Sequence, residues 1–339
     1  MPAHGVQPDP AGGTTAGVEA ARAERAAGNG RRVTGHERRS GRESGAVRFA
    51  LLILLLPAAT LAAGDLKLAT WNLEWLIAPE AMQALRGNCT PEGVRPPPHA
   101  RTIPCDVAAK LNRSRADFDA LARYARLLDA DVVALQEVDG ASAAQLVFPG
   151  YRFCFTGRHH VQNTGFAIRP GIPFRCGKDL KSLSLGDTVR RGAELVLYPG
   201  ESREFRLLSV HLKSGCGNRL LNDSRKECAA VGRQVPLLEQ WIDGEAAAGR
   251  PFAVLGDFNR DLRRDKGPAR TGSGAPLRLW PEIDDGAPPG ADLTNTAEGG
   301  RFVNCSMRQT FQGYIDYIVL SRSLAAGLEA GSFDRVVYR

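Results

Sequence analysis

The sequence lacks an apolar run long enough to cross a membrane as a helix. Residues 49–63 (FALLILLLPAATLAA) carry no charge, but they number only 15, whereas a membrane-spanning helix needs about 20. Arg48 precedes this run and the small residue Gly64 follows it, an arrangement typical of a signal peptide. We therefore interpret residues 48–63 as a signal peptide, with a short signal anchor as the alternative.

The first 47 residues lack apolar periodicity and are rich in Ala, Gly and Arg. Because such a composition cannot form a core, we expect residues 1–47 to be a disordered or mis-assigned N-terminal extension. Translation that begins near Val47 would place the signal peptide at the N-terminus, whereas a signal anchor would leave a cytoplasmic tail. Residues 64–339 number 276, which is few enough for one domain.

A zinc site is not indicated, because the sequence has no Cys-x-x-Cys motif and no pair of its six histidines at ligand spacing. All seven cysteines follow residue 63. In an exported chain such cysteines form disulfides, so we expect a secreted or periplasmic protein. Proximity in sequence predicts the three disulfides Cys89–Cys105, Cys154–Cys176 and Cys216–Cys228. Cys305 is then predicted to be unpaired.

A strong charge of one sign is also missing. The chain has 44 basic and 37 acidic side chains, a net charge of +7, and residues 64–339 account for +4 of it. This small excess permits a polyanionic partner but does not by itself indicate one.

Short apolar strands dominate residues 64–339. The helical spacing of apolar residues predicts a helix over 115–128 with Ser114 as its N-cap, and a second helix over 228–241 that Pro236 kinks. Residues 88–104 and 263–300 are rich in Pro and Gly and are predicted to be loops. Strands are predicted at 65–72, 131–135, 151–155, 164–168, 193–197, 205–211, 252–255 and 314–320. This order favours two packed sheets with helices outside them.

Four of these strands end in polar residues that a core does not need, and these are Asn72, Glu137, His211, and Asp257 with Asn259. Taken singly, each has a structural explanation as a turn, a cap or a hydrogen-bonded core histidine. The recurrence of such ends is harder to explain structurally. Carboxylate and amide oxygens suit Mg²⁺ or Mn²⁺, and a histidine can move a proton near neutral pH, so we predict a metal-assisted site.

Five segments resemble the endonuclease/exonuclease/phosphatase superfamily, which includes deoxyribonucleases, abasic-site endonucleases, neutral sphingomyelinases and inositol polyphosphate phosphatases. They are ATWNLEWL (69–76), VVALQEV (132–138), LLSVHLKSG (207–215), AVLGDFN (253–259) and YIDYIVLS (314–321), and they occur in the family's order. The resemblance implies an α+β fold, a four-layer α/β/β/α sandwich of two packed, mainly antiparallel sheets flanked by helices. It also implies metal-dependent cleavage of phosphate esters.

The resemblance also implies roles for the strand-end residues. Asn72 and Glu137 would hold Mg²⁺, or Mn²⁺, with Glu137 as the principal ligand. His211 would bind the scissile phosphate, Asp257 would orient or deprotonate the attacking water, and Asn259 would hold water or a phosphate oxygen.

Three further residues receive roles from the same resemblance. Arg190 is the candidate for contact with phosphate, and its neighbour Arg191 is an equal candidate. Asp316, in Ile-Asp-Tyr, corresponds to an aspartate that orients a second histidine in the family.

The chain departs from the family pattern at its C-terminus. Family members carry a Ser-Asp-His segment and a last strand after Ile-Asp-Tyr, and the sequence up to Arg339 contains neither. We therefore expect the domain over residues 64–339 to lack its last strand, the strand over 65–72 to have an unpaired edge, and catalysis to be severely reduced.

The function expected from these features is an exported, Mg²⁺-dependent phosphodiesterase, a nuclease that hydrolyses DNA or RNA. We expect a monomer with no stable membrane association after leader cleavage. A sphingomyelinase-like phosphoesterase is one alternative, although no loop has the clustered Trp, Phe or Leu that membrane contact needs. The other alternative is a degenerate member of the same fold that binds without cutting.

Overall fold

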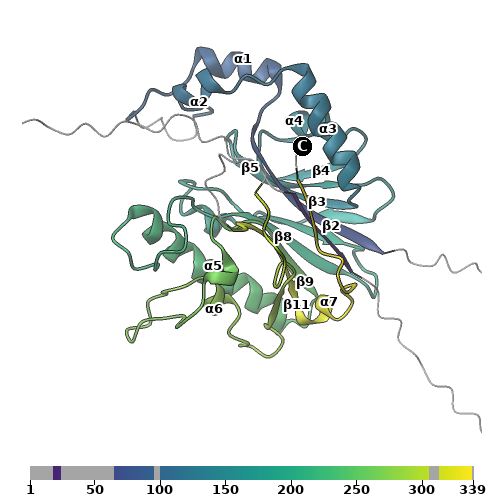
Figure 1. The fold of residues 1–339 in the computed structure, drawn as a ribbon, viewed down its shortest axis with the longest axis vertical. Coiled ribbons are helices and arrows are strands. Elements are labelled where there is room, and N and C mark those ends of the chain that lie inside the picture. Colours follow the sequence, from purple (N-terminus) through teal and green to yellow (C-terminus); the bar gives the residue numbers. More distant parts are fainter. Residues whose placement is uncertain (1–17, 24–64, 95–99, 305–312, 338–339) are drawn as a thin grey trace, which may run out of the picture.

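Two β-sheets pack face to face, and helices cover the outer face of each sheet (Figure 1). The structure is a computed structural model that describes residues 18–23, 65–94, 100–304 and 313–337. The predicted four-layer α/β/β/α sandwich is therefore confirmed.

The first sheet has six strands, and only its pair β2–β3 is parallel. In spatial order its strands are β12 (Asp334–Val336), β1 (Val18–Ala23), β2 (Leu66–Leu76), β3 (Val132–Val138), β5 (Asn163–Ile168) and β4 (Arg152–Phe155).

The second sheet also has six strands, and again one central pair, β8–β9, is parallel. Its spatial order is β10 (Leu293–Asn295), β11 (Asp316–Ser321), β9 (Phe252–Asp257), β8 (Phe205–His211), β7 (Ala193–Leu197) and β6 (Phe174–Cys176).

The helices form the two outer layers. On the side of the first sheet lie α1 (Pro79–Gly87), α2 (Cys105–Lys110), α3 (Arg115–Leu128) and α4 (Ala141–Val147), and on the side of the second sheet lie α5 (Lys226–Ala247) and α6 (Trp280–Ile283) (Figure 1). The short α7 (Arg322–Ala325) follows β11, and two 3₁₀ turns span Lys181–Ser184 and Leu262–Arg264.

Side chains alternate between two apolar layers along each central strand. In β3, Val132 and Ala134 pack into the core between the sheets, whereas Val133 and Leu135 pack against α3 and α4. Because both faces of such a strand are covered, its sequence is a continuous apolar run and not an alternation. The third core layer lies between the second sheet and α5 and α6.

The ends of α3 agree with the sequence prediction. The Ser114 hydroxyl accepts a hydrogen bond from Asp117 N, and the Asp117 carboxylate accepts one from Ser114 N at 2.7 Å. This reciprocal capping satisfies backbone donors that a helix N-terminus otherwise leaves free. The second predicted helix is longer than expected, because α5 runs from Lys226 to Ala247 with Pro236 inside it.

All eight predicted strands are present, with bounds that differ by a few residues. The prediction of a structureless loop over 263–300 was wrong, because α6 and β10 lie within it. These elements are three or four residues long, which is too short for a periodic pattern to identify. The helices α1, α2, α4 and α7 were also missed; they have nine residues at most, so each offers few repeats of the helical period.

The expectation of an unpaired edge at the first long strand was also wrong. β1 pairs antiparallel with β2, from Val18 opposite Trp71 to Ala23 opposite Leu66, and β12 pairs with the other side of β1. The backbone groups on that side of β2 therefore have partners within the sheet. The predicted signal peptide over 48–63 lies outside the described residues.

All three predicted cysteine pairs are disulfides, namely Cys89–Cys105, Cys154–Cys176 and Cys216–Cys228. Each closes a loop of 12 to 22 residues, which the chain-entropy account values at about 3 kcal/mol. Cys305 lies outside the described residues. Among the helices that the structure describes, none has the length and apolar character to span a bilayer.

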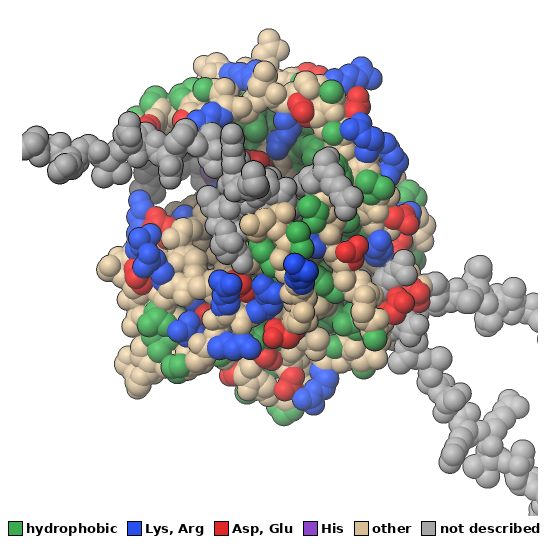
Figure 2. Space-filling view, viewed as in Figure 1, with side chains coloured by type: hydrophobic (Ala, Val, Ile, Leu, Met, Phe, Trp, Pro, Cys, Tyr) green, Lys and Arg blue, Asp and Glu red, His purple; other side chains and the backbone are tan. Residues whose placement is uncertain are grey.

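Basic and acidic side chains are intermixed on the molecular face drawn in Figure 2. This face therefore presents no extended surface of one sign. A preference for a polyanion has to come from local groups, which directs attention to the ends of the strands.

Glu239 is a buried carboxyl group in α5 with 7% of its surface exposed, and its Oε2 has no hydrogen-bond partner among the described residues. Burial raises its pKa to about 8, with further contributions from Glu282, Asp243 and Asp285, and Arg270 opposes them. The folded state therefore holds this proton at neutral pH, whereas the unfolded state releases it near pH 4.5.

We predict that Glu239→Gln stabilises the protein at alkaline pH. The stability that the bound proton provides is complete below about pH 4.5 and is lost as pH rises to about 8. The variant should therefore melt at the same temperature as the wild type at pH 4 and more than about 2 °C higher at pH 8.5. Melting followed by circular dichroism tests this, with exposed Glu92→Gln as the control, and a constant difference across pH would contradict it.

Candidate active site

The polar strand ends predicted from the sequence lie together at one edge of the sandwich. Asn72 is the last residue of β2 before its register shift, and Glu137 is the next-to-last residue of the parallel neighbour β3. His211 and Asp257 end the parallel pair β8–β9, where they are opposite each other in register. Because parallel strands run in the same direction, their carboxyl ends meet at the same edge of a sheet. Because the two sheets pack face to face, the site residues of β2–β3 lie next to those of β8–β9.

Local backbone irregularities aim the site residues of the first sheet. Glu137 has φ of +59°, and the pairing of β3 with β5 shifts register around it. A β-bulge of this kind redirects a side chain at the end of a strand. A similar shift follows Asn72 in β2, where Arg113 donates to the carbonyl oxygens of Leu73, Glu74 and Trp75 at 2.7 to 3.0 Å.

Gly256 allows the second sheet to present Asp257. Its φ is +143°, and a Cβ at this position would lie 2.0 Å from the carbonyl oxygen of Val210 in the neighbouring strand. Only glycine permits this approach. The Gly-Asp-Phe-Asn sequence therefore combines a close contact between β8 and β9 with a strand end that carries polar groups.

Asn72 links the two carboxylates of the site. Its Nδ2 donates to Glu137 Oε1 at 3.2 Å and to Asp257 Oδ2 at 3.0 Å, while its Oδ1 accepts from Glu74 N. His211 Nε2 lies 3.8 Å from the same Glu137 oxygen and 3.6 Å from the same Asp257 oxygen. Four of the predicted residues thus converge within a few ångströms.

Burial changes the proton affinity of two of these groups. It raises the pKa of Asp257 to about 7, against the opposing hydrogen bonds from Asn72 and Asn259 N, and Glu137 raises it further. Burial also lowers the pKa of His211 well below 6.5, and the neighbouring cations, led by Arg190, lower it further. At neutral pH the imidazole is therefore neutral, and Asp257 can both accept and release a proton.

The two arginine candidates have different surroundings. Arg190 Nη2 donates to the carbonyl oxygen of Leu212 at 2.8 Å, and Asn259 Nδ2 donates to the same oxygen at 3.2 Å. Arg191 instead forms ion pairs with Asp187 at 2.8 Å and Asp179 at 3.1 Å. The structure therefore brings Arg190, and not Arg191, to the strand ends.

Asp316 begins β11 and lies opposite Asp257 in register. Its surface is 7% exposed, so this carboxyl group belongs to the same edge of the second sheet. Asn259 follows with φ of +53°, and its N donates to Asp257 Oδ1 at 2.7 Å, which fixes the turn after β9.

Gln162 was not identified from the sequence. Its Nε2 donates to Glu137 Oε2 at 2.6 Å, so both oxygens of Glu137 accept from a side-chain amide. Gln162 lies in the loop between β4 and β5, which contains no apolar pattern that could have drawn attention to it. Only the pairing of β3 with β5 brings this loop beside Glu137.

The donor set fits a divalent cation. Two carboxylates from different sheets share one amide donor in a buried position, which leaves negative charge that a cation would balance. Within the described ranges, no three His, Cys, Asp or Glu side chains are arranged to hold a metal. An ion here would therefore take one or two protein ligands and keep several waters, as Mg²⁺ commonly does.

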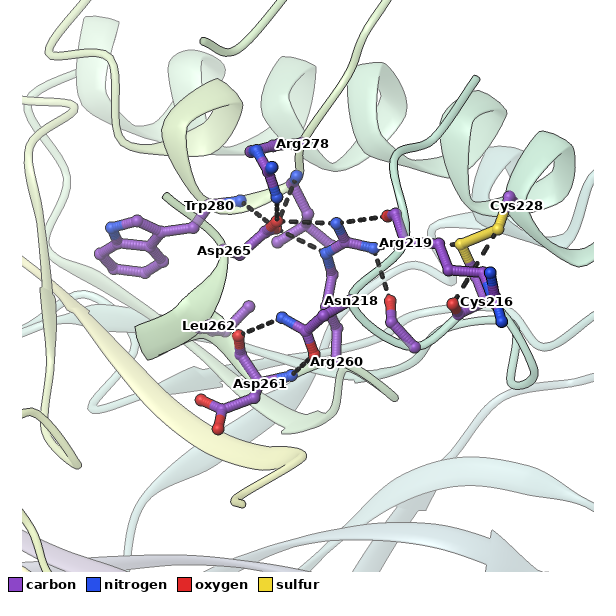
Figure 3. A network of polar contacts seen from close by, with 12 residues as sticks. Cys216, Asn218, Arg219, Cys228, Arg260, Asp261, Leu262, Asp265, Arg278 and Trp280 are labelled. Atoms are coloured by element: carbon purple, nitrogen blue, oxygen red, sulfur yellow. Dashed lines mark hydrogen bonds and ion pairs between the residues drawn. A yellow bond between two sulfur atoms is a disulfide. The ribbon is translucent and has the colours of Figure 1, made fainter. Parts of the chain in front are cut away.

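A buried ion pair anchors the chain that follows Asn259 (Figure 3). The Arg260 guanidinium donates to both oxygens of Asp265, at 2.6 and 2.7 Å, and to the carbonyl oxygens of Gly217 and Arg219. Asp265 also accepts from the backbone N–H groups of Leu279 and Trp280. This network ties the segment after β9 to the loop that the Cys216–Cys228 disulfide closes.

Removal of the Gln162 amide should weaken cation binding. We predict that Gln162→Leu raises the dissociation constant for Mn²⁺ about 10-fold, because loss of a group that orients a metal ligand typically costs 10- to 100-fold in affinity. Calorimetric titration measures this without relying on activity. Exposed Gln145 in α4 offers the control Gln145→Leu, and an unchanged dissociation constant for Gln162→Leu would show that the hydrogen bond does not orient Glu137.

Removal of Arg260 should destabilise the fold more than removal of a surface arginine. Arg260→Gln removes the bidentate partner of the fully buried Asp265 carboxylate and leaves it only the longer ion pair with Arg278, at 3.4 Å. Breaking a buried ion pair in this way costs about 3–5 kcal/mol. Arg322→Gln breaks an exposed ion pair with Asp292 and should cost at most about 1 kcal/mol. Urea unfolding compares the two variants, and equal losses would mean that the buried pair is not what stabilises this loop.

Comparison with known proteins places this geometry in a family. The pattern of the Endonuclease/Exonuclease/phosphatase family matches residues 69–333. No curated protein sequence matches the chain.

Solved structures resemble the chain at low sequence identity. The human Nocturnin catalytic domain with bound sulfate is 18% identical over 62% of this chain and 76% of that one, with a TM-score of 0.41. TDP2 from Caenorhabditis elegans is 15% identical over 62% and 60%, with a TM-score of 0.42. The 3′-5′ exonuclease from Neisseria meningitidis is 15% identical over 61% and 85%, with a TM-score of 0.40. Because the family pattern covers most of its length, the chain belongs to the Endonuclease/Exonuclease/phosphatase family.

Proposed function

We propose that this protein is a metal-dependent phosphodiesterase, an exported nuclease that hydrolyses DNA or RNA with Mg²⁺ or Mn²⁺. The family as a whole acts on phosphate esters. The observation that carries the proposal is the convergence of Glu137, Asp257 and neutral His211 beside the cation Arg190. These are the groups that hydrolysis of a phosphate ester requires.

Each residue has a task in in-line attack on phosphorus. Asp257, with its pKa near 7, accepts the proton of the attacking water at neutral pH. Neutral His211 donates a hydrogen bond to a non-bridging oxygen of the phosphate, and Arg190 offsets charge on the same group. Asn72 and Asn259 hold Asp257 in place through hydrogen bonds to its two oxygens.

Glu137 would hold the divalent cation, with Gln162 and Asn72 fixing the orientation of its carboxylate. When bound, the cation would supply positive charge to the phosphate oxygens. Asp316 would act at the same sheet edge, beside Asp257.

Nucleic acid is favoured over lipid as the substrate. The large apolar side chains that are exposed in the described part of the chain come from separate segments and are Val94, Leu127, Leu146, Leu220 and Val303. Contact with a membrane needs such side chains to gather on one face, which disfavours a sphingomyelinase-like enzyme. A degenerate binding protein is disfavoured because the acid, the imidazole and the guanidinium all remain at one edge.

Export is supported by the disulfides. Three disulfides among seven cysteines suit an oxidising compartment, so we propose a secreted or periplasmic location and action as a monomer without stable membrane association. Cleavage near residue 63 would also remove β1 (Val18–Ala23) from the first sheet and expose the edge of β2. Mass spectrometry of the N-terminus of the exported protein tests this cleavage and shows whether β1 belongs to the mature protein.

Glu137→Gln should abolish hydrolysis while the fold is retained. The substitution removes one negative charge and keeps the shape, so Mn²⁺ binding and the cleavage rate of plasmid DNA or RNA should both fall at least about 100-fold, whereas the melting temperature should change little. Asp119→Asn, at an exposed position of helix α3, serves as the control. Wild-type cleavage that persists in EDTA, or equal rates for Glu137→Gln and wild type, would refute the assignment.

A further inference from the structure

Three cationic side chains around the candidate active site have no carboxylate at ion-pair distance among the described residues. Arg158 donates to the carbonyl oxygens of Gln162 and Asp187, Arg190 to that of Leu212, and Lys213 to that of Ser214. Other arginines nearby are paired with carboxylates, as Arg191 is with Asp187. These three charges are therefore available to an anion.

Hydrogen bonds place the three cations at the strand ends. Arg158 contacts the carbonyl oxygen of Gln162, whose side chain donates to Glu137. Arg190 shares the carbonyl oxygen of Leu212 with Asn259. Lys213 directly follows Leu212, and its N donates to Gln234 Oε1 at 2.9 Å, which positions the residue after β8.

Arg190 lies between the other two in the chain of contacts, because Arg158 donates to the carbonyl oxygen of Asp187, three residues before Arg190, and Arg190 donates to that of Leu212, next to Lys213. Burial lowers the pKa of Arg158 to about 10, and Arg190 is the next cause. Burial likewise lowers the pKa of Lys213, again followed by Arg190. The two outer cations come from different loops, β4–β5 and β8–α5, so they approach Arg190 from the two sheets.

Like charges in a partly buried site repel each other and are costly unless an anion balances them. One phosphodiester group carries one negative charge, which Arg190 alone would meet. A polynucleotide strand adds one negative charge with each further phosphate. The positive charges of Arg158 and Lys213 therefore exceed what the negative charge of the scissile phosphate needs.

We propose that Arg158 and Lys213 bind the phosphate groups on either side of the scissile phosphate, with Arg190 at the scissile phosphate itself. This inference rests on the proposed nuclease function and makes the substrate an internal linkage of a polynucleotide strand. Arg158 would contact the phosphate on one side, and Lys213 the phosphate on the other.

Short thymidine substrates test the proposal through their end phosphates. TpT, pTpT, TpTp and pTpTp share the same internal phosphodiester linkage. TpT has no flanking phosphate, pTpT has one at the 5′ end, TpTp has one at the 3′ end, and pTpTp has both. Each flanking phosphate should raise kcat/KM about 10-fold, mainly through KM, because it adds hydrogen bonds between charged groups, which are stronger than neutral ones. Arg158→Gln should remove the rise in kcat/KM that the phosphate at one end provides, and Lys213→Gln should remove the rise that the phosphate at the other end provides. The control Arg322→Gln should keep both effects.

Binding without cleavage gives a second measurement. With labelled oligothymidylate in EDTA, the slope of log Kd against log salt concentration should fall by about 0.7 in each of Arg158→Gln and Lys213→Gln, and should not change in Arg322→Gln. An unchanged slope in both Arg158→Gln and Lys213→Gln would overturn the proposal, whether or not the protein hydrolyses any substrate. A lack of hydrolysis with normal slopes would instead count against the nuclease function. Release of inorganic phosphate from pTpT faster than cleavage of its linkage would also overturn it, because the three cations would then serve one terminal phosphate.

Discussion

The side-chain amide of Asn72 donates to one carboxylate from each sheet, and the candidate active site depends on this link. Asn72 and Glu137 belong to the first sheet and Asp257 to the second. A change in the separation of the sheets would break one of these hydrogen bonds. The core between the sheets, with Leu68 and Leu255 among its members, therefore sets the geometry of the site as well as the stability of the fold.

Charge balance at this edge follows from that geometry. Two carboxylates come together with little water, so Asp257 holds its proton more tightly than a free aspartate does. Burial, and after it the nearby cations, lowers the pKa of His211, which stays neutral. Neither carboxylate forms an ion pair with Arg190 or Arg158 among the described residues, so the positive side chains surround the carboxylates without neutralising them. Such an arrangement leaves room for both a metal ion and a phosphate anion.

The loops beyond the strands are held by links other than strand pairing. Covalent and ionic links supply it on the side of the second sheet, where the Cys216–Cys228 disulfide and the buried Arg260–Asp265 pair meet (Figure 3). On the side of the first sheet, Arg113 holds the bulge after Asn72 through three carbonyl oxygens. Both devices hold the residues that directly follow a site residue, Asn72 in the first sheet and Asn259 after the second.

The amino-acid sequence by itself determined the strand ends and the cysteine pairs. Asn72, Glu137, His211 and Asp257 could be identified because each follows an apolar run, and parallel pairing places such ends at one edge. The cysteine pairs could be identified because each is close in sequence, so a short loop brings the two thiols together. These features depend on local pattern and on short separations along the chain.

Only the tertiary structure decided the contacts between distant segments. Arg190 and Arg191 are adjacent and chemically identical, and their surroundings alone direct one to the site and the other to Asp187. Gln162 meets Glu137 because β3 pairs with β5, and no periodic pattern records that contact. The edge of β2 is covered by β1, although the composition around β1 predicted no strand. A sequence pattern reports the preferences of neighbouring residues, whereas these contacts arise from loops and edges that the packed sheets bring together.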